Sequence, residues 1–427
     1  MSENIIAATI NVEHQLTKST EDNEGIKLRG GVYVEQRNRT FESRWMSFVI
    51  GNASSGNFNS ALLDQPLETI FSEPNINAQT GFLLNEGTDG TNKYNASNKL
   101  IAGYIGTTIP IGKLNISTGV RVEHNIQELN TKTQSNTPIK VNNPVTSILP
   151  SMNVAYNFTK KMLVRAAFAQ TINRPEFREI APFGFYDFEN SWKITGNPNL
   201  KVAQVNNYDL RWEYYPTANE SVSLGGFYKD FTNPIETYIE PQGTLDPAYY
   251  FGNAPKANCY GVEAEVRKSL NFISDKSIFE RFTVLINATL IKSEVKLDDS
   301  KLLAGQQSTR PLQGQSPYVI NAGLYYRDDA NQFQVNIMYN VFGPRLFGVG
   351  DKMFASVYQV ERHVIDLTAT KGFGKHFEMK AGIQDLLNQA FLMKEDSDRN
   401  YKKSAADQQV ASVKRGSYFT LGASYRF

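Results

Sequence analysis

The most constraining feature of this sequence is an alternation of apolar and polar residues that continues for an unusual length. Residues 113–129 read KLNISTGVRVEHNIQEL, in which Leu114 to Val122 supply the apolar positions and Asn115 to Gln127 the polar ones. A period of two is that of a β-strand, whose successive side chains point to opposite faces. Strands of soluble proteins usually stop after about 5 to 6 residues, whereas a tilted strand needs about 9 to 11 to cross a membrane. We therefore expect one face toward lipid and the other toward a wet lumen.

The same alternation recurs about sixteen times along the chain. The segments begin near positions 5, 26, 40, 97, 113, 147, 162, 204, 221, 257, 281, 317, 332, 361, 376 and 416. No helical pattern of comparable strength is present, and no run of about 18 apolar residues could form a transmembrane helix. The repeated pattern indicates an all-β fold.

The connections between these segments are alternately short and long. Short ones lie at 37–39, 110–112, 159–161, 216–220, 327–331 and 372–375, with a medium one at 269–280. Long ones cover 51–96, 128–146, 172–203, 232–256, 295–316, 343–360 and 389–415. Soluble domains rarely contain loops longer than about 12 to 15 residues, whereas outer-membrane barrels have short periplasmic turns and long external loops. The alternation predicts a transmembrane, antiparallel, up-and-down β-barrel.

Composition and the end of the chain agree with this prediction. Lys plus Arg (44) and Asp plus Glu (43) nearly cancel, so nothing steers the protein toward nucleic acid. Aromatic residues make up 12% of the chain, and several lie beside the short turns, as an interfacial girdle requires. The chain ends on an apolar strand face at Phe427. Outer-membrane barrels of Gram-negative bacteria resemble this ending, which their barrel assembly machinery is understood to read.

Several stretches resemble the barrel of TonB-dependent receptors, particularly those of Bacteroidetes-type bacteria. They are GVRVEHNIQELN, LPSMNVAYNFTKKMLVRAAFAQTINRPEFREIAPFGFYDF, GNPNLKVAQVNNYDLRWEYYP, SVSLGGFYKDFTNPIE, RPLQGQSPYVINAGLYY and DLTATKGFGKHFEMKAGIQDLLNQAF. The resemblance covers nearly the whole chain from about position 66. It implies a location in the outer membrane, in contact with its lipid.

The resemblance also implies a barrel of about 22 strands with a plugged lumen, opened by the TonB complex acting through the plug. The sequence departs from the family pattern, because signal peptide, energy-coupling box and plug domain are not found in it. Sixteen strands would leave about six N-terminal strands missing, an even number, so the first strand is expected to run outward. We therefore expect residues 1–427 to be the C-terminal portion of such a barrel.

The function implied by the resemblance is active uptake of a small extracellular ligand, such as a siderophore, cobalamin or an oligosaccharide. The alternative is a plug-free, porin-like channel or a structural barrel, because sixteen strands can close at porin size. An enzyme is not expected, since nothing pairs a Ser or Asp with a His as a barrel hydrolase requires. The histidines lack metal-ligand spacing, so neither a metal site nor a cofactor is predicted. They are His14, His124, His363 and His376.

The loop at 172–203 combines rings and charges at a density that is costly to leave in water unless they are packed or used. Aromatic surface with a few oriented polar groups suits a sugar ring or a siderophore. The candidate ligand-binding residues are Arg174, Phe177, Arg178, Phe185, Tyr186 and Trp192, with Tyr249 and Tyr250 from the next loop. The alternative, at least as well supported, is that these rings pack the loop onto the barrel wall.

Overall fold

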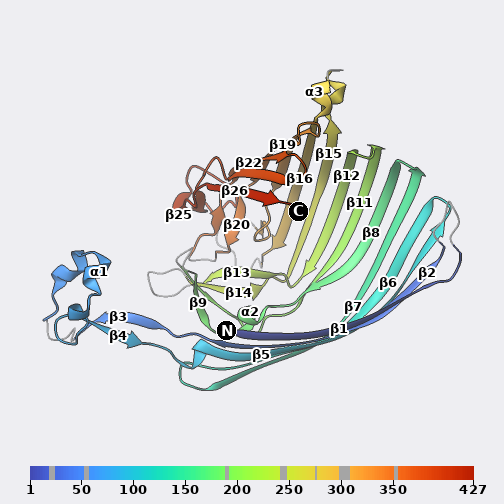
Figure 1. Ribbon diagram of the computed structural model, residues 1–427. Helices are drawn as coiled ribbons and strands as arrows, with labels where there is room; N and C mark the ends of the chain where they lie inside the picture. Colours follow the sequence, from blue (N-terminus) through green and yellow to red (C-terminus); the bar gives the residue numbers. More distant parts are fainter. Residues whose placement is uncertain are drawn as a thin grey trace.

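One antiparallel sheet contains the long strands of the chain (Figure 1). The structure, a computed structural model, describes residues 1–18, 25–51, 57–187, 192–240, 248–274, 277–297, 308–350 and 354–427. Within these residues the sheet has sixteen strands, of which fifteen follow one another in chain order and the two-residue β17 (Thr309–Arg310) pairs beside them. The fifteen are β1 (Ser2–Gln15), β2 (Lys27–Glu42), β5 (Lys93–Ile111), β6 (Leu114–Lys132), β7 (Pro138–Thr159), β8 (Met162–Asn173), β11 (Ala203–Thr217), β12 (Glu220–Thr232), β15 (Lys256–Ser269), β16 (Phe282–Lys296), β18 (Tyr318–Asp328), β19 (Phe333–Phe342), β22 (Arg362–Phe373), β23 (Phe377–Gln384) and β26 (Tyr418–Tyr425).

The two faces of the strands differ as the alternation predicts. On β11, Tyr208 and Leu210 are 47% and 59% exposed, whereas Glu213 on the opposite face is 8% exposed. On β6, Val122 is exposed, while Glu123 is buried beneath a loop that folds against the inner face. The apolar face therefore points outward from the curved sheet and the polar face points inward, which confirms the predicted assignment.

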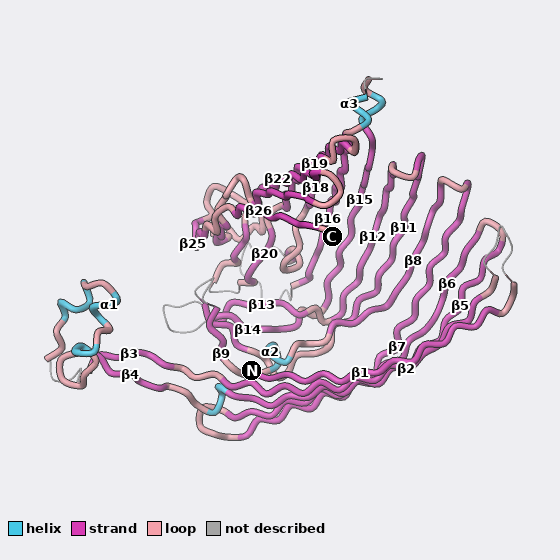
Figure 2. Tube along the Cα trace, viewed as in Figure 1, coloured by secondary structure: helices cyan, strands magenta, loops and turns pink. Residues whose placement is uncertain are grey.

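Most short connections lie at one end of the sheet and the long connections at the other (Figures 1 and 2), and the five-residue connection 133–137 between β6 and β7 is at the long-loop end. The turn between β5 and β6 has only two residues, and Gly112 within it takes φ +56°, a left-handed conformation that Gly adopts without steric cost. Long connections follow β2, β8, β12, β16, β19 and β23. The predicted antiparallel sheet, with nearest neighbours paired and long loops together, is confirmed.

Two predicted connections are wrong. Residues 37–39 do not form a turn, because β2 pairs without interruption with β1 on one side and β5 on the other; Arg39 faces inward and donates to Glu3 at 2.5 Å. The predicted loop at 128–146 shrinks to 133–137, since β6 and β7 stay paired as far as Lys132 and Pro138. As β2 is one strand instead of two, β1 runs from the loop end toward the turn end, opposite to the expected direction.

The long loops fold into three small sheets of their own. The first is β13 (Ile235–Glu240), β14 (Ala248–Asn253), β10 (Trp192–Thr195) and β9 (Gly184–Asp187); the second is β20 (Arg345–Gly348), β21 (Val357–Gln359), β24 (Phe391–Glu395) and β25 (Gln408–Val413); the third is β3 (Met46–Ile50) with β4 (Phe82–Glu86). The helices are η1 (Ser60–Asp64), α1 (Leu67–Ile70), η2 (Glu73–Asn75), η3 (Gly90–Asn92), α2 (Phe177–Ile180), η4 (Leu270–Phe272) and α3 (Ser277–Glu280). Across the described ranges, no helix has the length and apolar character needed to span a bilayer.

Candidate functional site in the long loops

The loop that follows β8 is fastened to the inner wall of the sheet where it begins. The Arg174 guanidinium donates to the carboxylate of Glu123 on β6, which also accepts a hydrogen bond from Arg121 at 2.6 Å. Gln127, four residues further along β6 on the same face, donates to the carbonyl of Pro175 at 2.8 Å. Because hydrogen bonds to ionised groups are the stronger ones, these contacts hold the loop against the wall. The predicted ligand residue Arg174 thus has a partner within the protein.

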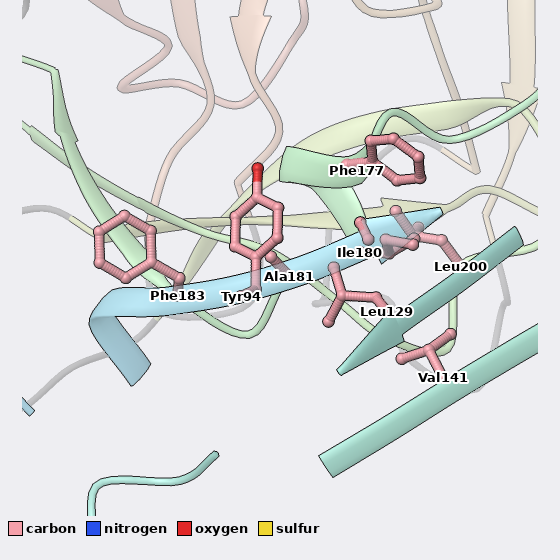
Figure 3. Close-up of a cluster of buried hydrophobic side chains, with 9 residues drawn as sticks. Tyr94, Leu129, Val141, Phe177, Ile180, Ala181, Phe183 and Leu200 are labelled. Carbon is pink, nitrogen blue, oxygen red and sulfur yellow. The ribbon is translucent and has the colours of Figure 1, made fainter. Parts of the chain in front are cut away.

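A buried apolar cluster continues this attachment (Figure 3). Figure 3 shows Ile180 and Ala181 among Tyr94 of β5, Leu129 of β6 and Leu200. The cluster consists of Tyr94, Ala96, Leu129, Val141, Phe177, Ile180, Ala181, Phe183 and Leu200. Phe177, a predicted ligand residue, is 2% exposed and lies 5.2 Å from the guanidinium carbon of Arg39. Its ring therefore packs the loop onto the wall.

Two other predicted residues of this loop, Arg178 and Phe185, contact each other, and the half-buried Phe185 ring also packs against the same apolar cluster. The Arg178 guanidinium carbon is 3.6 Å from the centroid of the Phe185 ring, a cation–π contact, and its side chain is exposed. Burial raises the pKa of the neighbouring Glu179 carboxyl, as does the charge of Glu176, although a backbone hydrogen bond opposes them. Tyr186 is half-buried on β9. A charged plane stacked on an aromatic ring is a surface that could receive an anionic or aromatic ligand.

The loops after β8 and β12 join through a parallel pairing of β10 with β14. This pairing places Tyr249 and Tyr250 in one small sheet with Phe185 and Tyr186. Tyr249 is 2% exposed and packs with Ile239, Val357 and Met393, and burial raises its pKa. Tyr250 stacks on Tyr238 with centroids 5.6 Å apart. The side chain of Trp192 lies outside the described residues, although its backbone belongs to β10.

A buried ion pair joins three of the long loops. Both nitrogens at the end of Arg310 donate to the Glu236 carboxylate, at 2.6 and 2.9 Å, and both side chains are 1% exposed. The backbone N–H of Gln313 donates to the same carboxylate at 3.0 Å, and the Gln313 amide reaches the carbonyl of Phe347. Sequence reasoning missed this pair, because the two residues are 74 positions apart and neither lies in a recognisable motif.

A cavity of about 520 Å³ opens among the loops next to this pair. Its wall includes four basic residues and one acidic residue, namely Lys292, Arg310, Lys402, Lys403 and Glu294. Within this set Lys292 pairs with Glu294 at 2.7 Å, and Lys403 pairs with Glu361, which lies outside the set. The sequence showed no signal for this cavity, because its residues come from loops separated by more than a hundred positions.

Comparison with known protein families shows what this barrel is. The family model described as "TonB dependent receptor-like, beta-barrel" matches residues 8–386. The chain belongs to this family. TonB-dependent receptor barrels lie in the outer membrane, so the predicted location is confirmed together with the fold. The family consists of receptors and transporters rather than enzymes.

Solved structures of TonB-dependent receptors share this fold. The ferric-catecholate import receptor Fiu from K12 E. coli has a TM-score of 0.63 at 12% identity, with 99% of this chain and 55% of Fiu covered. The siderophore receptor PiuA from Acinetobacter baumannii has 0.62 at 13%, covering 99% and 56%. The unliganded ferric citrate transporter FecA has 0.59 at 13%, covering 99% and 55%. The chain thus spans little more than half the length of these structures. A search of curated proteins found no match.

Proposed function

We propose that this chain is a barrel portion of an outer-membrane receptor that captures a small extracellular ligand and takes it up by TonB-dependent active transport. The family match over residues 8–386 carries this proposal. Loops layered over one end of the sheet supply a capture surface, and a polar inner face supplies a path. We propose no enzymatic activity for it.

Three finer points belong to the same proposal. The chain is the C-terminal portion of the barrel, which fits its coverage of about half of each related structure. It is of Bacteroidetes type, on the strength of stretches such as DLTATKGFGKHFEMKAGIQDLLNQAF. In the cell, the TonB complex acts on the receptor through a plug, and the barrel assembly machinery recognises the strand that ends at Phe427, whose side chain is fully exposed.

We propose that the ligand is an anionic metal chelate. Cobalamin and oligosaccharides are the alternative ligands for the same kind of uptake. The exposed Arg178 on Phe185 suits negative charge beside aromatic surface. Related structures carry the names of ferric citrate, ferric catecholate and copper transporters. The contact residues proposed are Arg178, Phe185, Tyr186, Trp192 and Tyr250, while Arg174, Phe177 and Tyr249 support them from below.

The experiment measures equilibrium binding of ferric citrate and of a ferric catecholate to the purified chain. Quenching of the intrinsic protein fluorescence reports the binding. We expect the Arg178→Ala variant to bind one of them about tenfold more weakly or worse, since a hydrogen bond to a charged group contributes about 1.5 to 3 kcal/mol. The matched control is Arg327→Ala, whose residue pairs with Asp329 at the opposite end of the sheet and should leave binding unchanged.

Two results would contradict the proposal. Equal loss of binding in the Arg178 and Arg327 variants would show that the loops do not hold the ligand. Steady single-channel conductance of the chain in a planar bilayer, without binding of either chelate, would favour the porin-like alternative.

A further inference from the structure

The connection between β24 and β25 has the spacing of a calcium-binding loop. Residues 396–407 read DSDRNYKKSAAD. EF-hand loops have twelve residues and take side-chain oxygens from positions 1, 3, 5 and 12, with a backbone carbonyl from position 7. Here these positions are Asp396, Asp398, Asn400 and Asp407, with Lys402 supplying the carbonyl. Asp replaces the usual Glu at position 12.

The folded loop brings the carboxylates of the three aspartates together. One carboxylate oxygen from each of the three aspartates lies within 4.8 Å of the others, although Asp396 is 1% and Asp407 9% exposed. The backbone N–H groups of Asn400 and Tyr401 donate to Asp396 at 3.2 and 3.1 Å. Tyr401 takes φ +56° at position 6, where an EF-hand has the glycine of its sharp turn. The backbone thus folds around one point.

A separate observation indicates that something is held at this point. The Tyr358 hydroxyl on β21 is buried without a hydrogen-bond partner, in a side chain that is 8% exposed. The Asp396 N–H donates to the Ser356 carbonyl at 2.8 Å, which puts Asp396 and Tyr358 on the same face of the β21–β24 pair. A buried hydroxyl left without a partner, on the face that carries Asp396, indicates a further group at this point.

Two lysines beside the cluster, Lys403 and Lys394, have partners other than its carboxylates. Lys403 pairs with Glu361, and Lys394 reaches the backbone carbonyl of Asp407 at 3.4 Å instead of its carboxylate. Three carboxylates at this separation repel one another strongly when burial lowers the effective dielectric constant. A hard divalent cation would remove that repulsion and satisfy the oxygens at the same time.

We propose that residues 396–407 bind one Ca²⁺ ion through Asp396, Asp398, Asn400, Asp407 and the Lys402 carbonyl. Ca²⁺ fits better than Mg²⁺, because it accepts six to eight oxygens in flexible geometry, whereas Mg²⁺ requires a strict octahedron and retains its water. The ion orders the turn between β24 and β25 and, through Lys402 and Lys403, one wall of the loop cavity. Extracellular Ca²⁺ modules have Kd values of about 10⁻⁴ to 10⁻³ M, and we expect a value in this range.

The test uses the purified full chain in detergent, freed of metal by chelation. Tb³⁺ replaces Ca²⁺ as a luminescent probe, excited through tyrosine, since Tyr401 and Tyr358 lie beside the loop. We expect saturable luminescence that Ca²⁺ displaces and Mg²⁺ at the same concentration does not. Asp398→Asn should weaken Ca²⁺ binding at least tenfold. The Asp398 carboxylate accepts a hydrogen bond from the Asn400 amide, and an asparagine can keep that contact.

A second measurement follows the loop itself. Trypsin cleaves after Lys402 and Lys403, whose side chains are exposed, and millimolar Ca²⁺ should slow this cleavage at least fivefold in the wild-type chain but not in Asp398→Asn. The matched control is Asp64→Asn, an exposed aspartate in another long loop, which should behave as wild type. Luminescence and cleavage that are the same in the wild type and in Asp398→Asn, or unaffected by Ca²⁺, would overturn the proposal.

Discussion

Glu236 and Arg310 show how single residues decide the arrangement of the long loops. Glu236 lies on β13 and Arg310 on β17 at the rim of the large sheet, and neither side chain is more than 1% exposed. Removing two charges from water costs several kcal/mol for each ion, and only close geometry with further hydrogen bonds offsets it. The Gln313 N–H supplies such a bond. We therefore infer that the main effect of the pair is to determine which loops contact each other. Its net contribution to the stability of the loops is smaller.

Arg310→Met should open this region, because the Glu236 carboxylate would then be buried without a counter-charge. Losing one partner of a buried pair costs about 3 to 5 kcal/mol, and we expect a loss of this size in the free energy of opening measured by amide hydrogen exchange on β13. The control is Arg44→Met, whose partner is Glu86 and whose side chain is 62% exposed; its exchange should not change. Equal effects of the two substitutions would show that burial of the pair does not matter.

At this scale the sequence singled out a loop but not the roles of its residues. The density of rings and charges drew attention to the loop after β8, whose use as a ligand site stays a prediction, and the structure shows this loop folded against the wall. This density did not separate the buried Phe177 and Tyr249 from the exposed Arg178. That distinction depends on partners such as Leu129 and Met393, which lie far along the chain, and no local pattern carries that information. The aspartate spacing at 396–407, in contrast, was readable in the sequence.

At the scale of elements, each strand is oriented by the difference between its apolar face and its polar face. β11 turns Leu210 outward and Asp209 inward, and β12 beside it turns out Leu224, which is 56% exposed. Outward apolar residues are stable there because lipid, rather than water, surrounds them. The same logic tolerates charge on the inner face, where Arg211 bonds to Ser223 at 2.9 Å.

Leu210→Lys should therefore impair membrane assembly, whereas Asp209→Lys on the opposite face should not. A Lys on the lipid face near mid-bilayer costs about 2 to 4 kcal/mol, and urea titration of the barrel folded into lipid vesicles would measure it. Similar midpoints for the two variants would mean that the faces are assigned wrongly.

Most elements were predictable from the alternation of apolar and polar residues and from loop length. Strands that cross a membrane must be long, and their side chains must alternate between an apolar and a polar face. The two errors lie where this constraint ends. Residues 37–39 read RNR, and 128–146 contains many polar residues with Pro138 and Pro144, so that the strands there resemble loops. Their pairing depends on neighbours, as Arg39 with Glu3 illustrates. The small loop sheets were not predicted either, since their short strands pair across distant segments, such as β10 with β14.

At the scale of the whole molecule, the order of the sheet leaves two edges. Among the described residues β1 and β26 stand at the two ends of the strand order. Figure 1 shows the sheet curved between them, with the loop sheets that contain β13 and β20 on its concave side and the β3–β4 pair extending beyond its end. Backbone groups left without partners in lipid cost several kcal/mol each, and an open edge is a template for further pairing. Within a longer receptor, neighbouring strands would cover both edges.

The 427 residues alone should therefore associate edge to edge in detergent. β1 has 14 residues and β26 has 8, so pairing two copies of β1 would satisfy the larger number of backbone groups. Ala8 lies in the middle of β1, and antiparallel pairing of two copies would bring both residues 8 within disulfide reach, which requires Cα atoms about 4.4 to 6.8 Å apart.

In a Cys259→Ser background, Ala8→Cys should give disulfide-linked dimers on a non-reducing gel. Leu210→Cys, equally exposed but on a strand paired on both sides, should not. A chain that stays monomeric and does not cross-link at position 8 would show that its edges are satisfied within one molecule.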